Sequence, residues 1–322
     1  MAEKIGGHRI LVTGSLAWDQ IMEFGGNFKD HILPDKAHVI SISFLVEKLK
    51  KQRGGCSANI AYSLALLGEK PAILAAAGND FADYRAWLEG QGVDCRAVKV
   101  FADELTASCF ITTDMVNNQI VGFFPGAMRK AGELSLTKDL QGDKPVLAIV
   151  SPDDPAAMLR HARECRETKL PYLYDPSFQV TAMDGKTLLE GCRGAKALLM
   201  NDYEMAVLQE KTKLTDNEVL DLAELIIVTF GEKGSEIRRK GKDVVKIPPA
   251  KVGKVVDPTG AGDAYRAGFV SGLVSGYSLE SSGRMGSIAA VYVVEQHGPQ
   301  QHAYTRVDFL KRYQDNFGAA PS

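Results

Sequence analysis

Apolar runs alternate with helical periodicity along most of the chain. Nearly continuous apolar stretches occur at residues 9–15, 71–78, 145–151, 170–175, 195–202 and 225–231. Helical spacing of apolar residues follows at 58–67, which ends at Gly68, and at 154–168. Apolar runs of this length are typical of strands that are buried on both faces. The pattern therefore predicts an α/β fold with a mostly parallel sheet and helices on both of its faces.

Two regions alternate polar and apolar residues with a period of two. They are residues 38–46, and the pair 106–113 and 119–124, which is joined by the turn-forming Asn117-Asn118. Half-buried strands of this kind do not belong in a parallel core, so they predict a small separate sheet. This small sheet could be a lid over an active site, and an edge hairpin or a dimer contact explains it equally well.

The lid is expected to come from about residues 16–52 and 104–126. The chain contains neither an internal repeat nor a long Pro/Gly/Ser linker. Residues 1–322 are therefore expected to form a single domain with a lid.

Composition narrows the function classes. The net charge is −2 and 45% of the residues are hydrophobic, so no nucleic-acid partner is expected. No apolar run reaches the roughly 18 residues that a membrane span needs, and a cytoplasmic location is the default expectation. The five cysteines include no CxxC pair and the six histidines show no ligand spacing, so neither a disulfide framework nor a zinc site is predicted.

The stretch VVDPTGAGDAYRAGF at 255–269 predicts a strand, a glycine-rich loop and a helix. Backbone N–H groups from Gly260, Ala261, Gly262 and Asp263 would be free at the positive end of the helix, which suits a phosphate-sized anion. Asp263 could act there as a general base, with a pKa lowered by the helix end, or it could only cap the helix. A GxxxxGK[ST] loop and a GxGxxG motif are both absent from the sequence. The anion site is therefore expected to be neither that of a P-loop NTPase nor that of an NAD-type Rossmann enzyme.

Four motifs in order carry a resemblance to a known family. DPTGAGD at 257–263 and GGCSANIAYSLALLG at 54–68 resemble the C-terminal and N-terminal signatures of the ribokinase-like, or PfkB, family of carbohydrate and nucleoside kinases. NDYE at 201–204 matches the family's NxxE, and TFGEKG at 229–234 matches its TxGxxG. The resemblance covers essentially the whole chain and implies a three-layer ribokinase-like core with a β-sheet lid.

Within this family the chain most resembles the bacterial adenosine kinases. The phrases that carry this likeness lie at 13–19, 31–49, 78–94, 123–128 and 175–179. Phe178 departs from the pattern, because a polar residue is expected at its position.

The resemblance assigns roles to individual residues. Asp263 would accept the proton of the acceptor hydroxyl, and the N–H groups of Gly260, Ala261, Gly262 and Asp263 would hold the transferred phosphoryl group. The residues implied for ATP are Asn201, Thr229, Gly231, Gly234 and Ser287. Those implied for the nucleoside are Ser15, Asp19, Gly54, Gly55, Asn59, Phe110, Phe123, Met128 and Gln179. Lid packing explains Phe110, Phe123 and Met128 equally well.

Two groups of residues are candidates for cations. The resemblance implies that Glu204 holds Mg²⁺ through water, whereas Asn201 and Glu204 alone read as a helix capping box. It also implies that Asp257 and Thr259 can bind a monovalent cation such as K⁺, whereas an Asp-Pro pair by itself indicates turn initiation.

The expected reaction is the ATP-dependent phosphorylation of the 5′-hydroxyl of adenosine to AMP. The alternatives are the same chemistry on another nucleoside or on a furanose sugar such as ribose, and a nucleoside-binding protein without catalysis. Aromatic residues in the lid favour an acceptor that carries a base. The lid strands also suggest a homodimer, because they offer an apolar face.

Overall fold

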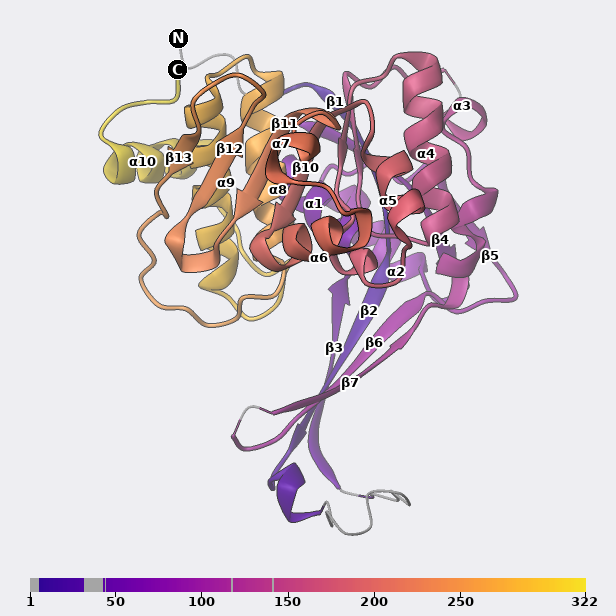
Figure 1. Cartoon of the computed structure of the whole chain (residues 1–322). Coiled ribbons are helices and arrows are strands. Elements are labelled where there is room, and N and C mark those ends of the chain that lie inside the picture. Colours follow the sequence, from indigo (N-terminus) through magenta and orange to yellow (C-terminus); the bar gives the residue numbers. More distant parts are fainter. Residues whose placement is uncertain (1–5, 32–42, 44, 117, 141) are drawn as a thin grey trace.

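The body of the molecule is built on a nine-stranded sheet (Figure 1). In this computed structural model, residues 6–31, 43, 45–116, 118–140 and 142–322 are described. The strand order is β13-β12-β11-β10-β9-β8-β1-β4-β5; neighbours from β11 to β5 pair in parallel, whereas β12 and β13 are antiparallel. The bounds are β1 Arg9–Thr13, β4 Lys70–Gly78, β5 Val98–Phe101, β8 Leu147–Val150, β9 Tyr172–Tyr174, β10 Ala195–Asn201, β11 Ala223–Thr229, β12 Ser235–Arg238 and β13 Val245–Ile247.

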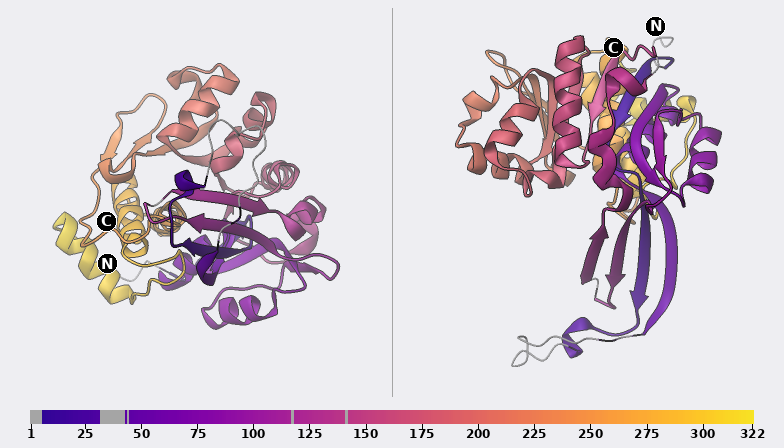
Figure 2. Two further views of the ribbon diagram at one scale, coloured as in Figure 1. Left: turned by 90° about the horizontal axis from the view of Figure 1, so that it is seen from below. Right: turned by 90° about the vertical axis from the view of Figure 1, so that its right-hand side faces the viewer.

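Helices cover both faces of this sheet, as Figure 2 shows from two further directions. Successive residues of β1 point to opposite faces: Ile10 and Val12 pack with α1, α2 and α8, whereas Leu11 packs with α4, α5 and α6. The helix bounds are α1 Cys56–Leu66, α2 Ala82–Gly90, α3 Leu136–Asp139, α4 Pro155–Thr168, α5 Gly185–Cys192, α6 Asp202–Thr212, α7 Asp216–Val219, α8 Ala261–Val274, α9 Leu279–Val294 and α10 Arg306–Phe317. The predicted α/β fold class is confirmed.

A four-stranded sheet projects from the body and forms the lid (Figures 1 and 2). Its order is β3-β2-β6-β7, with bounds β2 Ala17–Phe24, β3 Val46–Gly54, β6 Ala107–Thr113 and β7 Gln119–Phe124. β2 follows β1 after three residues, and β3 leads through Gly55 into α1. The lid is therefore tied to the carboxyl end of β1 and to the start of α1.

The lid strands differ in part from the sequence prediction. β6 and β7 lie where alternation predicted them, and Asp114 closes their turn by accepting hydrogen bonds from the N–H groups of Val116 and Asn118. The strand predicted at 38–46 lies mostly outside the described residues, and β3 begins only at Val46. β2 and most of β3 lie within residues 16–52, where the lid was expected, but they were not predicted as strands. Five of the nine residues of β3 are charged, which hides its alternation.

In the part of the chain that the structure describes, no helix has the length and apolar character that crossing a membrane requires.

Candidate active site

The first turn of α8 forms the centre of the candidate site. Gly260 is its N-cap residue, with φ of +83°, a conformation that favours glycine, and a Cβ there would come within 2.4 Å of the Pro299 Cβ. The Ala261 N–H already donates to the carbonyl of Pro258 at 3.1 Å, which corrects the expectation that it is free. The N–H groups of Gly262 and Asp263 lack an intrahelical acceptor by their position. They are the donors that this turn offers to an anion.

Asp263 points from this turn towards α1. The Nδ2 atom of Asn59 donates to Asp263 Oδ2 at 2.9 Å. Burial raises the pKa of Asp263 above its usual value, while Arg266 and the Asn59 hydrogen bond oppose the rise and Glu204 adds to it. The expectation of a lowered pKa was therefore wrong, because desolvation outweighs the helix end. A carboxylate with a raised pKa is the stronger base.

Arg266 lies on the same face of α8, one turn after Asp263. Its guanidinium pairs with the buried Asp175, with 2.6 Å between Arg266 Nη2 and Asp175 Oδ1. Burial lowers the pKa of Arg266, but the carboxylates of Asp175, Asp263 and Glu204 raise it above its ordinary value, so the arginine stays charged. A fixed positive charge thus stands behind the proposed base.

Asp19 of β2 faces the same region from the lid. Burial, followed by the charges of Asp257 and Asp263, raises the pKa of Asp19 to about 7. Gly54, at the end of β3, makes room for this carboxylate, since a Cβ there would come within 2.3 Å of Asp19 Oδ2. The structure therefore brings Asp19, Gly54, Asn59 and Asp263 together.

The two lid phenylalanines do not face the same way. Cys109 pairs with both Asp19 of β2 and Phe123 of β7, so these three positions share one face of the lid sheet. Phe110 is the next residue after Cys109 and lies on the opposite face. Phe110 and Phe123 therefore cannot both contact one base from the same lid face, and only Phe123 shares the Asp19 face.

The remaining acceptor candidates have structural contacts of their own. Met128 is buried against Ala17 and Ala107, which matches the packing alternative. Gln179 is buried and its Nε2 donates to the carbonyl of Asp153 at 2.7 Å. Ser15 Oγ accepts the N–H of Cys56 at 3.1 Å, next to Gly55 at the start of α1. Phe178, the residue that departs from the adenosine kinase pattern, is 49% exposed.

Beside the start of α8 lies a cavity of about 450 Å³. Of the predicted ATP residues, it is lined by Thr229, Gly231, Gly234 and Ser287, together with Ala261 and Gly262 of the anion-binding turn. Its other walls are largely apolar, formed by Pro249, Ala250, Val252, Val255, Ala290, Val291 and Val294. Such a wall suits the flat, largely apolar face of a nucleotide base.

Asn201 does not line this cavity. Its side chain accepts the N–H of Glu204 at 2.7 Å, and the Glu204 carboxylate accepts the N–H of Asn201 at 2.9 Å, which is a complete capping box at the start of α6. Glu204 also accepts from Ser177 Oγ at 3.2 Å. The capping alternative is thus realised, although Glu204 remains close enough to affect the pKa of Asp263.

Asp257 and Thr259 form a tight turn ahead of α8. One carboxylate oxygen of Asp257 accepts the Thr259 N–H at 2.9 Å, and the other accepts the Gly298 N–H at 3.0 Å. Asp257 therefore shapes the loop, as the turn alternative states. Among the described residues, no group of three or more His, Cys, Asp and Glu side chains is arranged to hold a metal ion.

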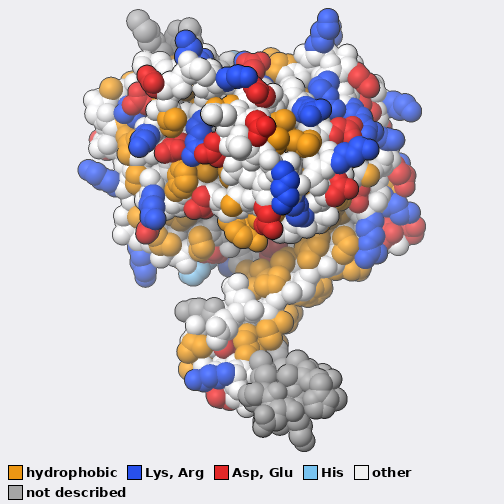
Figure 3. All heavy atoms as spheres, in the orientation of Figure 1, with side chains coloured by type: hydrophobic (Ala, Val, Ile, Leu, Met, Phe, Trp, Pro, Cys, Tyr) orange, Lys and Arg blue, Asp and Glu red, His pale blue; other side chains and the backbone are white. Residues whose placement is uncertain are grey.

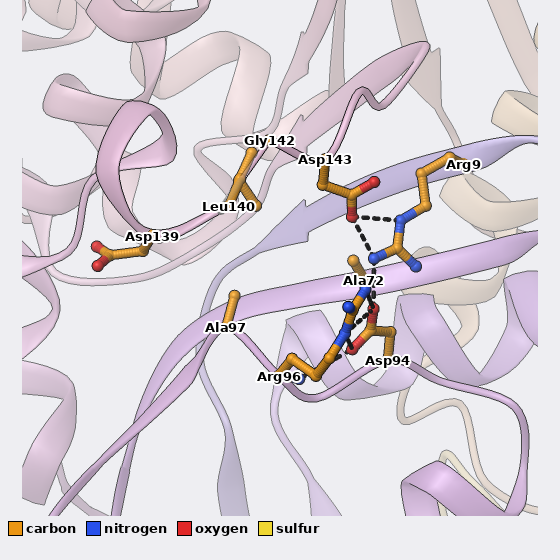
Figure 4. A pocket seen from close by; sticks show the side chains of 9 residues that line it. All are labelled: Arg9, Ala72, Asp94, Arg96, Ala97, Asp139, Leu140, Gly142 and Asp143. Carbon is orange, nitrogen blue, oxygen red and sulfur yellow. Dashed lines mark hydrogen bonds and ion pairs between the residues drawn. The ribbon is translucent and has the colours of Figure 1, made fainter.

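A second pocket, of about 280 Å³, lies at the other end of the sheet (Figure 4). Arg9, the first residue of β1, donates from Nε to Asp143 at 2.6 Å and also pairs with Asp94, which Arg96 holds from the other side. Arg96 and Arg9 keep the pKa of Asp94 below its usual range. Ligands of open α/β sheets bind at the carboxyl ends of the strands, so we assign no function to this self-paired cluster at an amino end.

Sequence reasoning missed Arg266 and Asp175 as parts of the site. A signal for Arg266 was present, since a residue three positions after Asp263 shares its helix face. Asp175 follows a buried strand, which places it at the same sheet edge as Asn201 and Thr229. The pairing of the two could not be predicted, because 91 residues separate them.

Comparison with known proteins agrees with this geometry. The sequence profile of the pfkB family of carbohydrate kinases matches residues 24–306. A nucleoside kinase of Methanocaldococcus jannaschii is 33% identical over 265 residues, which cover 82% of this chain and 86% of that protein.

Solved structures of the Burkholderia thailandensis nucleoside kinase are also similar. Its complex with inosine superposes with a TM-score of 0.87 at 34% identity, covering 97% of this chain and 99% of that one. Its ADP-inosine complex gives a TM-score of 0.83 at 36% identity and covers 97% of each chain.

Proposed function

The chain belongs to the pfkB family of carbohydrate kinases, and on this premise we propose that it transfers the γ-phosphoryl group of ATP to a hydroxyl group of a nucleoside. One observation carries the proposal. The first turn of α8 borders the 450 Å³ cavity through Ala261 and Gly262, while Asp263 of the same turn points to Asn59. Anion donors and a base thus stand between two binding regions, as an in-line transfer requires.

The acceptor we propose is adenosine, phosphorylated on its 5′-hydroxyl to give AMP. Asp19 would accept hydrogen bonds from the ribose hydroxyls, and Phe123 would pack on the base from the same lid face. Inosine is the second candidate, because the similar Burkholderia thailandensis enzyme was solved in complex with it. The exposed Phe178 offers no polar group that would select between the two bases.

Asp263 would act as the general base in this reaction. Its raised pKa makes it a better proton acceptor than an ordinary carboxylate, and its bond to Asn59 fixes the orientation. The N–H groups of Gly262 and Asp263 and the charged Arg266 would stabilise the negative charge of the transferred phosphoryl group. The proton moves from the acceptor hydroxyl to Asp263 as the new phosphorus–oxygen bond forms, while the bond between the γ-phosphorus and the bridging oxygen breaks and ADP leaves.

ATP would occupy the cavity between Thr229, Ser287 and the start of α8. Mg²⁺ would bind beside it through water, because the Glu204 carboxylate already accepts two protein hydrogen bonds. Glu204 would hold such waters, and the ion would neutralise phosphate charge when bound. At the Asp257 turn, the carboxylate and the Thr259 hydroxyl are oxygen donors that suit a monovalent cation such as K⁺.

We propose a homodimer formed through the lid and a single kinase domain in each chain. Apolar side chains cover much of the lid surface (Figure 3), and Leu49, Ile120, Val121 and Phe123 are each more than two-fifths exposed. A second lid would remove this surface from water. A dimer mass in light scattering supports the proposal, and a monomer mass at high concentration excludes it.

A panel of acceptors tests the proposed function. ADP release is measured with adenosine, inosine, guanosine, cytidine, ribose and fructose 6-phosphate, for the wild-type protein and for Asp263→Asn. We expect release with adenosine and inosine, and a fall in kcat of about 10²- to 10⁴-fold in the variant, because the amide cannot accept the proton.

Other outcomes of the panel would change the conclusion. Release with ribose alone would replace the nucleoside by a sugar, and release with none of the acceptors would favour a nucleoside-binding protein. Near-normal turnover of Asp263→Asn would remove the base from the mechanism.

A further inference from the structure

A short buried segment between α9 and α10 contacts several parts of the candidate site at once. The Gly298 N–H donates to Asp257, and Pro299 packs against Gly260 at the start of α8. The carbonyl of His302 accepts the Tyr62 hydroxyl of α1 at 2.6 Å. This segment, residues 298–302, is thus fixed between α1 and the anion-binding turn.

Gln300 is the centre of this segment and is only 3% exposed. Its Nε2 donates to Asn59 Oδ1 at 2.7 Å and to the Tyr84 hydroxyl at 2.6 Å. Both hydrogens of one amide nitrogen are therefore used, each by a different helix.

The contact with Asn59 determines which way the Asn59 amide faces. An amide can turn by 180° about its last bond, which exchanges its oxygen and its nitrogen. Gln300 Nε2 donates to Oδ1 of Asn59, so Nδ2 of Asn59 faces Asp263, where it donates at 2.9 Å. With the amide reversed, an oxygen would face the carboxylate and repel it.

The contact with Tyr84 leads to the acceptor side of the site. The Tyr84 hydroxyl donates to the carbonyl of Gly54 at 2.9 Å, and Gly54 is the residue against which the Asp19 carboxylate lies. The buried Gln300 amide thus belongs to two chains of hydrogen bonds. One runs through Asn59 to Asp263, and the other runs through Tyr84 to Gly54, beside Asp19.

We propose that Gln300 is a positioning residue for phosphoryl transfer, which holds Asn59 in the orientation that donates a hydrogen bond to Asp263. The inference rests on the proposed function, because it assigns a support to the proposed general base. Asn59, which the sequence placed among the nucleoside contacts, serves the base in this arrangement. Gln300 acts through Asn59 and touches no reacting atom.

The pKa of Asp263 depends on whether Asn59 donates a hydrogen bond to it. The Asn59 hydrogen bond lowers the pKa of Asp263, so its loss raises the pKa further. Five other charged or titratable groups affect or face Asp263, and none of them is changed by a substitution at Gln300. They are Arg266 of α8, Glu204 of α6, Asp175 after β9, Asp19 of β2 and Cys56 of α1.

The test is the pH dependence of kcat in Gln300→Met, which has a side chain of similar length without a donor. We expect kcat at pH 7 to fall about tenfold, as for loss of a hydrogen bond to a charged group. The acidic limb of the profile should move to higher pH, because a base must be unprotonated and the pKa of Asp263 has risen. KM for ATP should stay the same, since the cavity is untouched.

Tyr84→Phe is the matched control, because it removes the other bond of the same amide nitrogen. We expect it to raise KM for the nucleoside through Gly54 and to leave the acidic limb where it is. In an Asn59→Ala background, Gln300→Met should cause no further shift, since the two residues act in series. Gln300→Leu is measured in parallel, and melting temperatures show whether each variant is folded.

The outcomes separate the two proposals. An inactive wild-type protein would overturn the proposed function, whatever Gln300 does. An active wild type with an unchanged acidic limb in folded Gln300→Met or Gln300→Leu would overturn the positioning role alone. The same applies if the shift persists in full in the Asn59→Ala background, or if Tyr84→Phe reproduces it.

Discussion

At the scale of single residues, the site is dominated by carboxylates that burial makes harder to ionise. Asp263 has a raised pKa, and burial raises the pKa of Asp19 to about 7. Asp175 is buried as well but has Arg266 as its partner. The sequence supplied the positions of Asp19 and Asp263 through motifs, but the direction of the Asp263 shift required knowledge of what surrounds it.

Asp153 gives a residue-scale prediction about stability. It is 1% exposed, its Oδ2 has no hydrogen-bond partner, and burial raises its pKa to about 8. The folded protein therefore keeps this proton between about pH 4 and 8, whereas the unfolded chain releases it. Because the unfolded state binds fewer protons in this window, Asp153 should make the free energy of unfolding fall as pH rises.

Asp153→Asn should remove this dependence. Between pH 5 and pH 8 the wild type should lose about 3 to 4 kcal/mol more of its free energy of unfolding than the variant does. Urea unfolding at both pH values measures the difference, and Asp103→Asn, at a side chain that is 75% exposed, is the control. Parallel losses in the wild type and Asp153→Asn would contradict the assignment.

At the scale of elements, the strands that could be predicted from the sequence are those that are buried on both faces. Strands such as β10 and β11 are buried on both faces, so their apolar runs identify them without knowledge of the fold. The lid strand β3 is largely exposed and carries five charged residues, so no apolar pattern marks it. The support by Gln300 was also out of reach, since 241 residues separate it from Asn59.

The start of α8 gives an element-scale prediction. A Cβ at Gly262 would lie 2.6 Å from Arg266 Nη1 and would project at the exposed edge of the ATP cavity. Gly262→Val should therefore displace Arg266 and crowd the phosphates, with a fall in kcat of about 100-fold. Nucleoside affinity, measured by calorimetry, should change little.

Gly90→Ala is the control for this prediction, because a Cβ at Gly90 meets nothing within 4 Å. Normal turnover in Gly262→Val, or an equal fall in Gly90→Ala, would show that the first turn of α8 does not hold the phosphoryl group.

At the scale of the whole molecule, the proposed sites of the two substrates are built from different parts of the chain. The ATP cavity is lined by residues from Thr229 to Val294, whereas Asp19, Gly54 and Phe123 belong to the lid strands or their ends. The sequence suggested a lid from alternation, but which lid face meets the site follows only from the strand register.

The two lid phenylalanines test this division, since Phe123 shares the Asp19 face and Phe110 does not. Phe123→Ala should raise KM for adenosine about tenfold through the loss of a stacking contact and leave KM for ATP unchanged. Phe110→Ala should leave both values close to those of the wild type. Equal effects of the two substitutions on KM for adenosine would show that the face of the lid sheet on which a phenylalanine lies does not determine whether it contacts the base.

The order of these parts along the chain also matters during synthesis. Asp19 and Asn59 emerge from the ribosome early, Asp263 follows about two hundred residues after Asn59, and Gln300 follows later still. A nascent chain that has just completed α8 therefore has the base and its hydrogen-bond partner, but not the amide that sets the direction of that partner. The proposed catalytic geometry is completed only when residues 298–302 have folded onto α1.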